Sequence, residues 1–413
     1  MQNSVAHSES DLAAVAYLRS TQAIRDRCGQ LFELCLADRL DHFRCDLSQL
    51  NAAADYVIGV TQANYPDWQI PFHSRWRHFQ AGQVDRLAAL TQRLADLDPL
   101  EQARTRFDLA VTSVLLDAGA GPDWRYGEPS SGRTFQRSEG LAVASYHLFL
   151  EGGFSSQAGQ LWADASGLEA LSLEKLAAGF QVTDSNPLVG LEGRWQLLQQ
   201  LGKTLAQHPE LFGDSARPGG LVDYLLHQVQ NNQLSAHAVF EAVLAGFGEI
   251  WPGRVTLAGV NLGDVWPHSK LTNSTSGSQL VPFHKLSQWL TYSLLEPLQA
   301  LGLEITDLDR LTGLAEYRNG GLCLDLGLLH PKDPELLSQP HRPSSEVVVE
   351  WRALTLVLLD QIAARIRQQL DQPDLPLAKI LEGGTWAAGR QIAAAQRPGG
   401  GPPLQIISDG TVF

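Results

Sequence analysis

Apolar residues recur at helical spacing along most of this chain, and this pattern constrains the fold more than any other feature. It predicts helices over residues 12–36, 84–97, 101–116, 158–165, 193–205, 221–229, 236–247, 285–301 and 345–370. Strand-like alternation is confined to residues 181–183, 254–260 and 404–407. We therefore predict a mainly α fold, a compact helical architecture with a small peripheral β element, and exclude a doubly wound sheet.

Breaks rich in Gly, Pro or Ser occur at 119–129, 217–220 and 397–403, and only the last resembles a linker. After it, LQIISDGTVF predicts a docked terminal strand or hairpin. We expect one mostly helical unit over 1–413. It would contain a helical N-terminal part (1–150), a site-bearing part (151–396) and a docked C-terminal segment (397–413).

Charge and cysteine content narrow the class of protein. The formal net charge of -14 opposes nucleic acid as a partner and favours a small molecule. The four cysteines form no CxxC pair and no signal peptide precedes them, so we expect reduced thiols and a cytoplasmic location. No stretch approaches the roughly 18–20 apolar residues of a membrane span, so we expect a soluble protein and no membrane partner.

The stretch 281–329 sets charged residues into an apolar background, where an unpaired charge costs several kcal/mol, on the order of 3–5. Glu316 lies in AEYRNGG, and the Asn-Gly-Gly is predicted to be a turn that ends one helix and leads into another over 322–329. A carboxylate at this corner could stabilise a cationic sugar ring or activate water, or Glu316 could pair with Arg318 on the surface. Asp325 could be a partner of Arg318 or a second catalytic acid.

Three polar residues open the preceding predicted helix after Pro282. Lys285 and Gln288 are one turn apart, so they share a face, and His284 comes just before them. A helix N-terminus favours anions, so a phosphate or carboxylate of the ligand would suit Lys285. The alternative for Lys285 is a position facing solvent.

The sequence NLGDVWPHSKL at 261–271 carries Asp264, Trp266, His268 and Lys270 around a proline. Loops of this composition often line sites, so these residues are candidates for contact with substrate. Trp266 could stack on a flat ligand or belong to the core.

A basic cluster at 70–86 contains His73, Arg75 and Trp76, followed by Arg77 and His78. Arginine suits bidentate contact with phosphate or carboxylate, so we interpret the cluster as an anion clamp; a metal site is disfavoured by the lack of nearby carboxylate or cysteine ligands.

In RSEG, Ser138 is predicted to cap a helix with Glu139 in its first turn, which leaves Arg137 for a ligand. No GxSxG, GxxxxGK[ST] or GxGxxG motif is present, so serine hydrolase, P-loop and Rossmann interpretations are weak.

Long motifs then point to a family. PFHSRWRHFQAG, RSEGLAVASYHLFLEGGFSS, VPFHKLSQWLTYSLLEPL, LTGLAEYRNGGLCLDLG and SEVVVEWRALTLVLLD resemble the uracil catabolism protein 4 family over nearly the whole chain. The resemblance implies a role in pyrimidine degradation through opened-ring riboside or ribotide intermediates.

A fainter similarity is to the queuosine 5′-phosphate N-glycosidase family, whose fold is similar to helix-hairpin-helix DNA glycosylases. Lys285 and Gln288 match that family's helix, and Glu316, Tyr317 and Arg318 match its acidic-Tyr-Arg triplet. This chain departs from the pattern in having Glu in place of Asp, and Asn319 and two glycines after the arginine.

These resemblances imply an N-glycoside hydrolase that cleaves a ribosylurea, or its 5-phosphate, to urea or a ureido product and the sugar. No metal or organic cofactor is implied. The alternatives are a non-catalytic ligand-binding or scaffold protein of the pathway and a hydrolase of ureides or amides. The oligomeric state is not predicted.

Overall fold

The computed structural model describes residues 8–252, 255–272 and 274–407. They form two compact units, each built from segments that are distant in sequence. Unit 1 contains the described parts of Met1–His73, Gly253–Lys285 and Leu308–Ile407, and unit 2 those of Ser74–Pro252 and Leu286–Asp307. These boundaries differ from the divisions at 150 and 396 that the sequence suggested. That the two units make up one domain stays a prediction.

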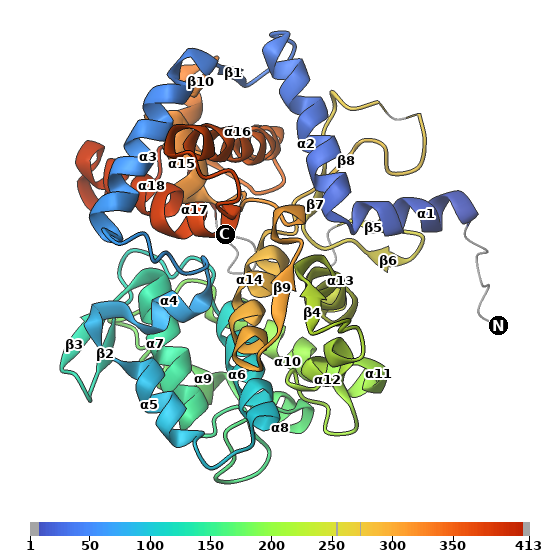
Figure 1. Ribbon diagram of the computed structural model, residues 1–413, viewed down its shortest axis with the longest axis vertical. Helices are drawn as coiled ribbons and strands as arrows, with labels where there is room; N and C mark the ends of the chain where they lie inside the picture. The colour runs from blue at the N-terminus through green and yellow to red at the C-terminus, as the bar shows by residue number, and fades with distance from the viewer. Residues whose placement is uncertain (1–7, 253–254, 273, 408–413) are drawn as a thin grey trace. The chain divides into compact units, whose positions relative to one another are not determined.

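Unit 1 is organised around one long helix. Helix α16 (Glu346–Leu370), drawn in dark red in Figure 1, packs against three other helices. They are α2 (Thr21–Leu36), α3 (Leu50–Asn64) and α15 (Tyr317–Asp325). Helix α15 also packs against α18. The remaining helices of unit 1 are α1 (Glu9–Leu18), η1 (Leu47–Gln49), η4 (Leu308–Arg310), η5 (Pro334–Leu337), α17 (Leu377–Ile380), the π-helix η6 (Leu381–Thr385), α18 (Trp386–Gln396) and η7 (Pro398–Gly400).

Unit 2 centres on α6 (Pro99–Leu115), which is buried over most of its length and packs against α7 (Arg137–Leu150), α10 (Leu191–Gln207) and α12 (Gly220–Leu226). The other helices of unit 2 are α4 (Arg75–Phe79), η2 (Ala81–Gln83), α5 (Arg86–Arg93), α8 (Ala165–Ala170), α9 (Leu173–Gly179), α11 (Pro209–Phe212), α13 (Ala236–Phe247) and η3 (Gly248–Ile250). Helix α14 (Lys285–Ala300) also belongs to unit 2, except for its first residue.

The sheets in the described residues all have two strands, so the predictions of a mainly α fold and a small β element are confirmed. The antiparallel pairs are β1 (Phe43–Cys45) with β10 (Leu329–Pro331), β2 (Tyr126–Glu128) with β3 (Arg133–Phe135), β5 (Thr256–Leu257) with β6 (Val260–Asn261), and β7 (Val265–Pro267) with β8 (Leu280–Pro282). The parallel pairs are β4 (Gln233–Ser235) with β9 (Glu304–Thr306) and β11 (Pro340–His341) with β12 (Gln405–Ile406). Among the residues that the structure describes, no helix has the length and apolar character that crossing a bilayer requires.

Some local predictions were wrong for identifiable reasons. The predicted helix 12–36 is interrupted, because the Ser20 hydroxyl accepts the Ala23 N–H and caps a new helix. Residues 158–164 are irregular, since the Asp164 carboxylate caps α8 by accepting the Gly167 N–H. The predicted strand at 181–183 is a single bridge between Thr183 and Asn186.

The predicted strand at 254–260 is instead the hairpin of β5 and β6, and Arg254 lies outside the described residues. The terminal strand is confirmed as β12, while the Asp-Gly signal at 409–410 also lies outside the described residues.

Candidate functional site

Glu316 immediately precedes α15 and caps it from a buried position. Its backbone is extended, and its carboxylate oxygens accept the N–H groups of Arg318 at 2.7 Å and Asn319 at 2.6 Å. Only 9% of Glu316 is exposed. Burial raises the pKa of Glu316 above its usual value, although the two N–H groups and the positive charges of Lys285 and Arg318 oppose this rise. The carboxylate is therefore fixed in position and more basic than an exposed glutamate.

The Asn-Gly-Gly sequence is not a turn, which corrects the predicted helix over 322–329. Gly320 and Gly321 lie inside α15, and the helix ends at Asp325. A Cβ on Gly320 would lie 2.5 Å from the Trp351 ring, whose N–H donates to the Gly320 carbonyl at 3.0 Å. Gly320 therefore allows α15 to approach α16 closely, whereas the sequence pattern indicated a chain reversal at this point.

The predicted surface pair between Glu316 and Arg318 is absent, and so is the predicted contact between Arg318 and Asp325. Arg318 is buried and donates to the Gly400 carbonyl at 2.7 Å. The Asp325 carboxylate accepts hydrogen bonds from Arg397 at 2.8 and 2.5 Å, so its negative charge is balanced by a structural ion pair. The Arg318 guanidinium lies 5.0 Å from the centre of the Tyr317 ring.

Asn319 follows Arg318 in the first turn of α15 and is fully buried. Its side-chain nitrogen donates to the Leu314 carbonyl at 3.1 Å, while its side-chain oxygen has no hydrogen-bond partner among the described residues. A buried acceptor without a donor is uncommon in folded proteins and is available to a ligand or water.

Within unit 1, Asp264 fixes the backbone of Lys285, the first residue of α14, and is linked through Arg352 to the segment that contains Glu316. One Asp264 oxygen accepts the Lys285 N–H at 3.0 Å, and both oxygens accept from Arg352 at 2.7 Å. Arg352 also donates to the Ala315 carbonyl at 3.1 Å, next to Glu316. Burial opposes charge on Asp264, but Arg352 more than offsets it, so the pKa of Asp264 is lowered. Arg352 therefore forms a buried salt bridge with Asp264, and Asp264 is a positioning residue.

His284 precedes α14 with a left-handed backbone, φ 46°, which costs energy for a residue with a side chain. Its ring is buried and Nε2 donates to the Leu18 carbonyl at 2.8 Å. Burial lowers the pKa of His284, which favours the neutral ring. The hydrogen bond to Leu18 gives His284 a structural function.

The loop predicted to line a site is mostly core. Trp266 lies in β7 and donates its indole N–H to Asp264 at 2.7 Å. His268 is buried, accepts the Lys270 N–H on Nδ1 at 3.2 Å, and places Nε2 3.7 Å from the Glu350 carboxylate. Lys270 forms an ion pair with Asp41 at the surface, at 2.8 Å.

His73 is the last residue of unit 1 and pairs with an acid that sequence analysis missed. Its Nδ1 lies 2.7 Å from Oε2 of Glu382, whose other oxygen accepts the Tyr65 hydroxyl at 3.3 Å. The Trp386 ring is 5.8 Å from the imidazole. Glu382 lies in the π-helix η6, and π-helices occur frequently at functional sites. The adjacent glycines Gly383 and Gly384 were the local sequence feature that could have drawn attention to Glu382.

In unit 2, Arg75 is fully buried and already ion-paired. It donates to Asp117 at 2.8 Å, to the Ser113 hydroxyl at 2.7 Å and to the Ser138 carbonyl at 3.2 Å. Trp76 donates to the Ser293 carbonyl at 2.7 Å. The predicted anion clamp is thus neutralised at Arg75 by a carboxylate that the sequence pattern did not indicate.

Two other candidates of unit 2 have unusual environments. Gln288 is fully buried on α14, and neither atom of its side-chain amide has a partner among the residues described. Arg137 begins α7 with φ 56°. The predicted cap at Ser138 is wrong, because Gln136 occupies the N-cap position.

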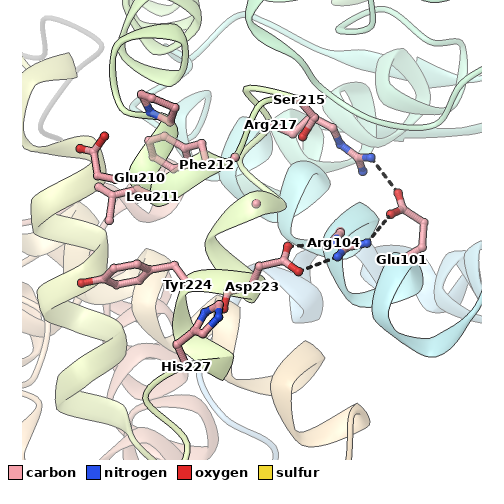
Figure 2. Close-up of a pocket in the computed structure, with 13 residues that line it drawn as sticks. Glu101, Arg104, Glu210, Leu211, Phe212, Ser215, Arg217, Asp223, Tyr224 and His227 are labelled. Atoms are coloured by element: carbon pink, nitrogen blue, oxygen red, sulfur yellow. Dashed lines mark hydrogen bonds and ion pairs between the residues drawn. The ribbon is translucent and has the colours of Figure 1, made fainter.

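A pocket of about 400 Å³ in unit 2 was not foreseen (Figure 2). Figure 2 shows Glu101 between Arg104 and Arg217, with Asp223 on the far side of Arg104. Glu101 accepts from Arg217 at 2.8 Å and from Arg104 at 3.2 Å, and Asp223 accepts from Arg104 at 2.9 and 2.5 Å. These charges already neutralise one another, so the ion pairs of this pocket leave little positive charge for an anionic substrate. No cluster of three or more His, Cys, Asp or Glu suited to a metal ion occurs in the described part of either unit.

Comparison with known proteins gives consistent matches over the chain. The model of a family described as "Protein of unknown function (DUF1688)" matches residues 17–413. Uracil catabolism protein 4 of Lachancea kluyveri is 40% identical over 435 aligned residues, which cover 97% of this chain and 99% of that protein. Protein urg3 of Schizosaccharomyces pombe (strain 972 / ATCC 24843) is 42% identical over 411, with the same coverage. The first resemblance predicted from the motifs is confirmed.

Proposed function

Because this chain belongs to the DUF1688 family, and a relative matching nearly all of it is named for uracil catabolism, we propose that it acts in uracil catabolism as an N-glycoside hydrolase. Its substrate would be a ribosylurea or the corresponding 5-phosphate. Water would replace the nitrogen at C1 of the sugar, so that urea or a ureido product and the free sugar, or its phosphate, are released.

The observation that carries this proposal is the buried carboxylate of Glu316. Cleavage of an N-glycosidic bond places positive charge on the sugar ring in the transition state, and a fixed anion in a dry site stabilises that charge. The N–H groups of Arg318 and Asn319 hold both oxygens of Glu316 without a flexible partner. The carboxylate therefore needs little reorganisation as the charge develops.

The raised pKa of Glu316 suits a second role in the same reaction. A carboxylate that is more basic than usual is a better acceptor for a proton of the attacking water. The departing urea nitrogen takes up a proton, so water is divided between the two products. Lys285 influences Glu316 electrostatically, and we assign its ammonium to the anionic end of a phosphorylated substrate.

One observation favours a second candidate, a non-catalytic ligand-binding protein of the same pathway. Capping α15 is a sufficient structural reason for a carboxylate at Glu316. Under this alternative the buried amide of Gln288 would contribute to recognition of a ligand and no bond would be cleaved. Hydrolysis of a ureide or amide bond is the third candidate.

The test is mass-spectrometric detection of products from synthetic ribosylurea and its 5-phosphate. We expect urea and the sugar from the native protein, and a loss of about 100-fold or more in Glu316→Gln. The matched control is Asp98→Asn, which alters an exposed carboxylate that caps α6, and it should keep full turnover.

Turnover that survives Glu316→Gln would remove Glu316 from the mechanism. Tight binding of either compound without products would instead establish the ligand-binding candidate. Cleavage within the ureido group would establish the third candidate.

A further inference from the structure

Two cysteines of unit 1 face each other at the junction of α2 and β1. Cys35 lies in the last turn of α2 and Cys45 is the last residue of β1, ten positions later. Their Sγ atoms are 3.0 Å apart. Cys35 is buried at 4% exposure and Cys45 is half-buried, so one sulfur of the pair lies nearer to solvent.

The packing of unit 1 anchors both cysteines. Cys45 is paired with Leu329 in the β1–β10 ladder, and α2 packs against α16. Between the two cysteines, the N–H groups of His42 and Phe43 donate to the Glu350 carboxylate of α16 at 3.1 and 2.8 Å. The approach of the sulfurs is therefore set by secondary-structure elements on both sides and by a buried carboxylate beneath the connecting chain.

We propose that Cys35 and Cys45 form a redox modification site, at which a peroxide converts the two thiols into a disulfide. One thiolate attacks the peroxide O–O bond and becomes a sulfenic acid. The second thiol attacks that sulfur and displaces water. With hydrogen peroxide, two thiols and one peroxide yield one disulfide and two waters, so the sulfurs are oxidised and the peroxide oxygens reduced. A small dithiol reverses the reaction.

The local chemistry favours this reaction. The hydrogen bond from Cys45 lowers the pKa of the Cys35 thiol, and thiolates are the reactive species. A disulfide requires an S–S distance of about 2.05 Å, so the sulfurs need to approach by roughly 1 Å. Two thiolates on one tetrahedral zinc ion are about 3.8 Å apart, so the two sulfurs lie closer together than a shared zinc ion would hold them.

The remaining cysteines provide internal controls. Cys28 and Cys323 are fully buried, and burial raises the pKa of both thiols, that of Cys323 to about 12. They are expected to stay reduced under mild oxidation of the folded protein, because neither forms a thiolate readily.

Peptide mapping tests the proposal without reference to any catalytic activity. Trypsin cleaves after Arg27, Arg39 and Arg44, so Cys35 and Cys45 fall in separate peptides, 28–39 and 45–75. The full-length folded protein is treated with hydrogen peroxide, alkylated and digested. We expect these two peptides to be joined, two hydrogen atoms lighter than their sum, and to be released by dithiothreitol.

Three single-residue variants complete the experiment. Because peptide 28–39 also contains Cys28, the variant Cys28→Ser should keep the cross-link, whereas Cys35→Ser and Cys45→Ser should each lose it. The proposal is overturned if Cys35 and Cys45 both remain available to the alkylating agent after peroxide treatment. It is also overturned if they are oxidised singly to sulfinic acids, or if the cross-link persists in Cys35→Ser, where it would have to run through Cys28.

Discussion

Arg352 binds Asp264 through two parallel hydrogen bonds of 2.7 Å, and the same carboxylate accepts the first N–H of α14. This pair determines where Lys285 begins its helix, in a region from which water is largely excluded. The Arg352 side chain is 1% exposed and that of Asp264 is 15% exposed. Since a buried ion is costly without its partner, the pair makes a sharp test of what stabilises unit 1.

We predict that Asp264→Asn lowers the free energy of unfolding by about 3 kcal/mol, because Arg352 keeps its charge and loses its counter-ion. Thermal and urea unfolding followed by circular dichroism would measure the change. The control is Asp41→Asn, which breaks the exposed pair with Lys270 and should leave the transitions where they are. Equal stability of Asp264→Asn and the native protein would contradict the prediction.

The close approach of α15 and α18 leads to a second prediction. A Cβ on Gly389 would meet the Arg318 carbonyl, a backbone group that cannot rotate away. We expect Gly389→Ala to lower the free energy of unfolding by about 1–3 kcal/mol, comparable to the effect of overpacking a core. A Cβ on Gly59 in α3 would have no atom within 4 Å of it. Because alanine favours the helix more than glycine does, Gly59→Ala should raise the free energy of unfolding by about 0.5–1 kcal/mol. Melting temperatures of the two variants that shift in the same direction would refute this explanation.

Much of the helical architecture was predictable, because apolar periodicity is a local property. Helix α13 has the predicted bounds, and α14 and α16 differ from prediction by one residue at one end. The sequence pattern did not predict helix α3. This helix packs against α16, a contact between distant segments that only the tertiary structure reveals. Conversely, Gly320 and Gly321 suggested a turn, because a sequence does not show which glycine has a tryptophan ring against it.

The candidate site was predictable only in part, since its partners are distant in sequence. Local sequence patterns identified Glu316 as an unusual carboxylate in an apolar segment. They could not show that Asp264 pairs with Arg352, 88 positions away, or that His73 pairs with Glu382, 309 positions away. Asp325 illustrates the same difficulty, because its partner is Arg397 rather than the nearby Arg318. A charge pattern therefore shows which residues require partners, while the fold decides which partners they have.

A third prediction concerns acid stability in unit 2. Glu128 is buried, and burial opposes its charge, but hydrogen bonds from Arg86, His147 and Ser131 lower the pKa of Glu128 to about 2. A lowered pKa stabilises the fold above the unfolded value of about 4.3, and this stabilisation is lost as the pH falls toward 2. The contribution is about 3 kcal/mol at neutral pH.

Glu128→Gln should therefore be less stable than the native protein at pH 7, and its unfolding free energy should depend less on pH between about 4.5 and 2. Urea unfolding at a series of pH values would measure both effects. The matched variant Glu192→Gln, at an exposed position of α10, should retain the native dependence. Parallel curves for Glu128→Gln and the native protein would exclude Glu128 as the source of acid sensitivity.

The final prediction joins the proposed activity to the electrostatics of its carboxylate. If ionised Glu316 stabilises the sugar cation, kcat/KM falls on the acid side with the pKa of this group, which burial raises above 4.5. The ammonium of Lys285 lowers that pKa, so Lys285→Met should move the acid limb to higher pH. Lys285→Arg, which keeps the charge, and Lys270→Met, which removes a surface charge paired with Asp41, should leave it in place. A pH–rate profile of each variant is the measurement. An acid limb that stays fixed in Lys285→Met while turnover continues would show that another group controls it, and Glu316 would then be left with its structural role as the cap of α15.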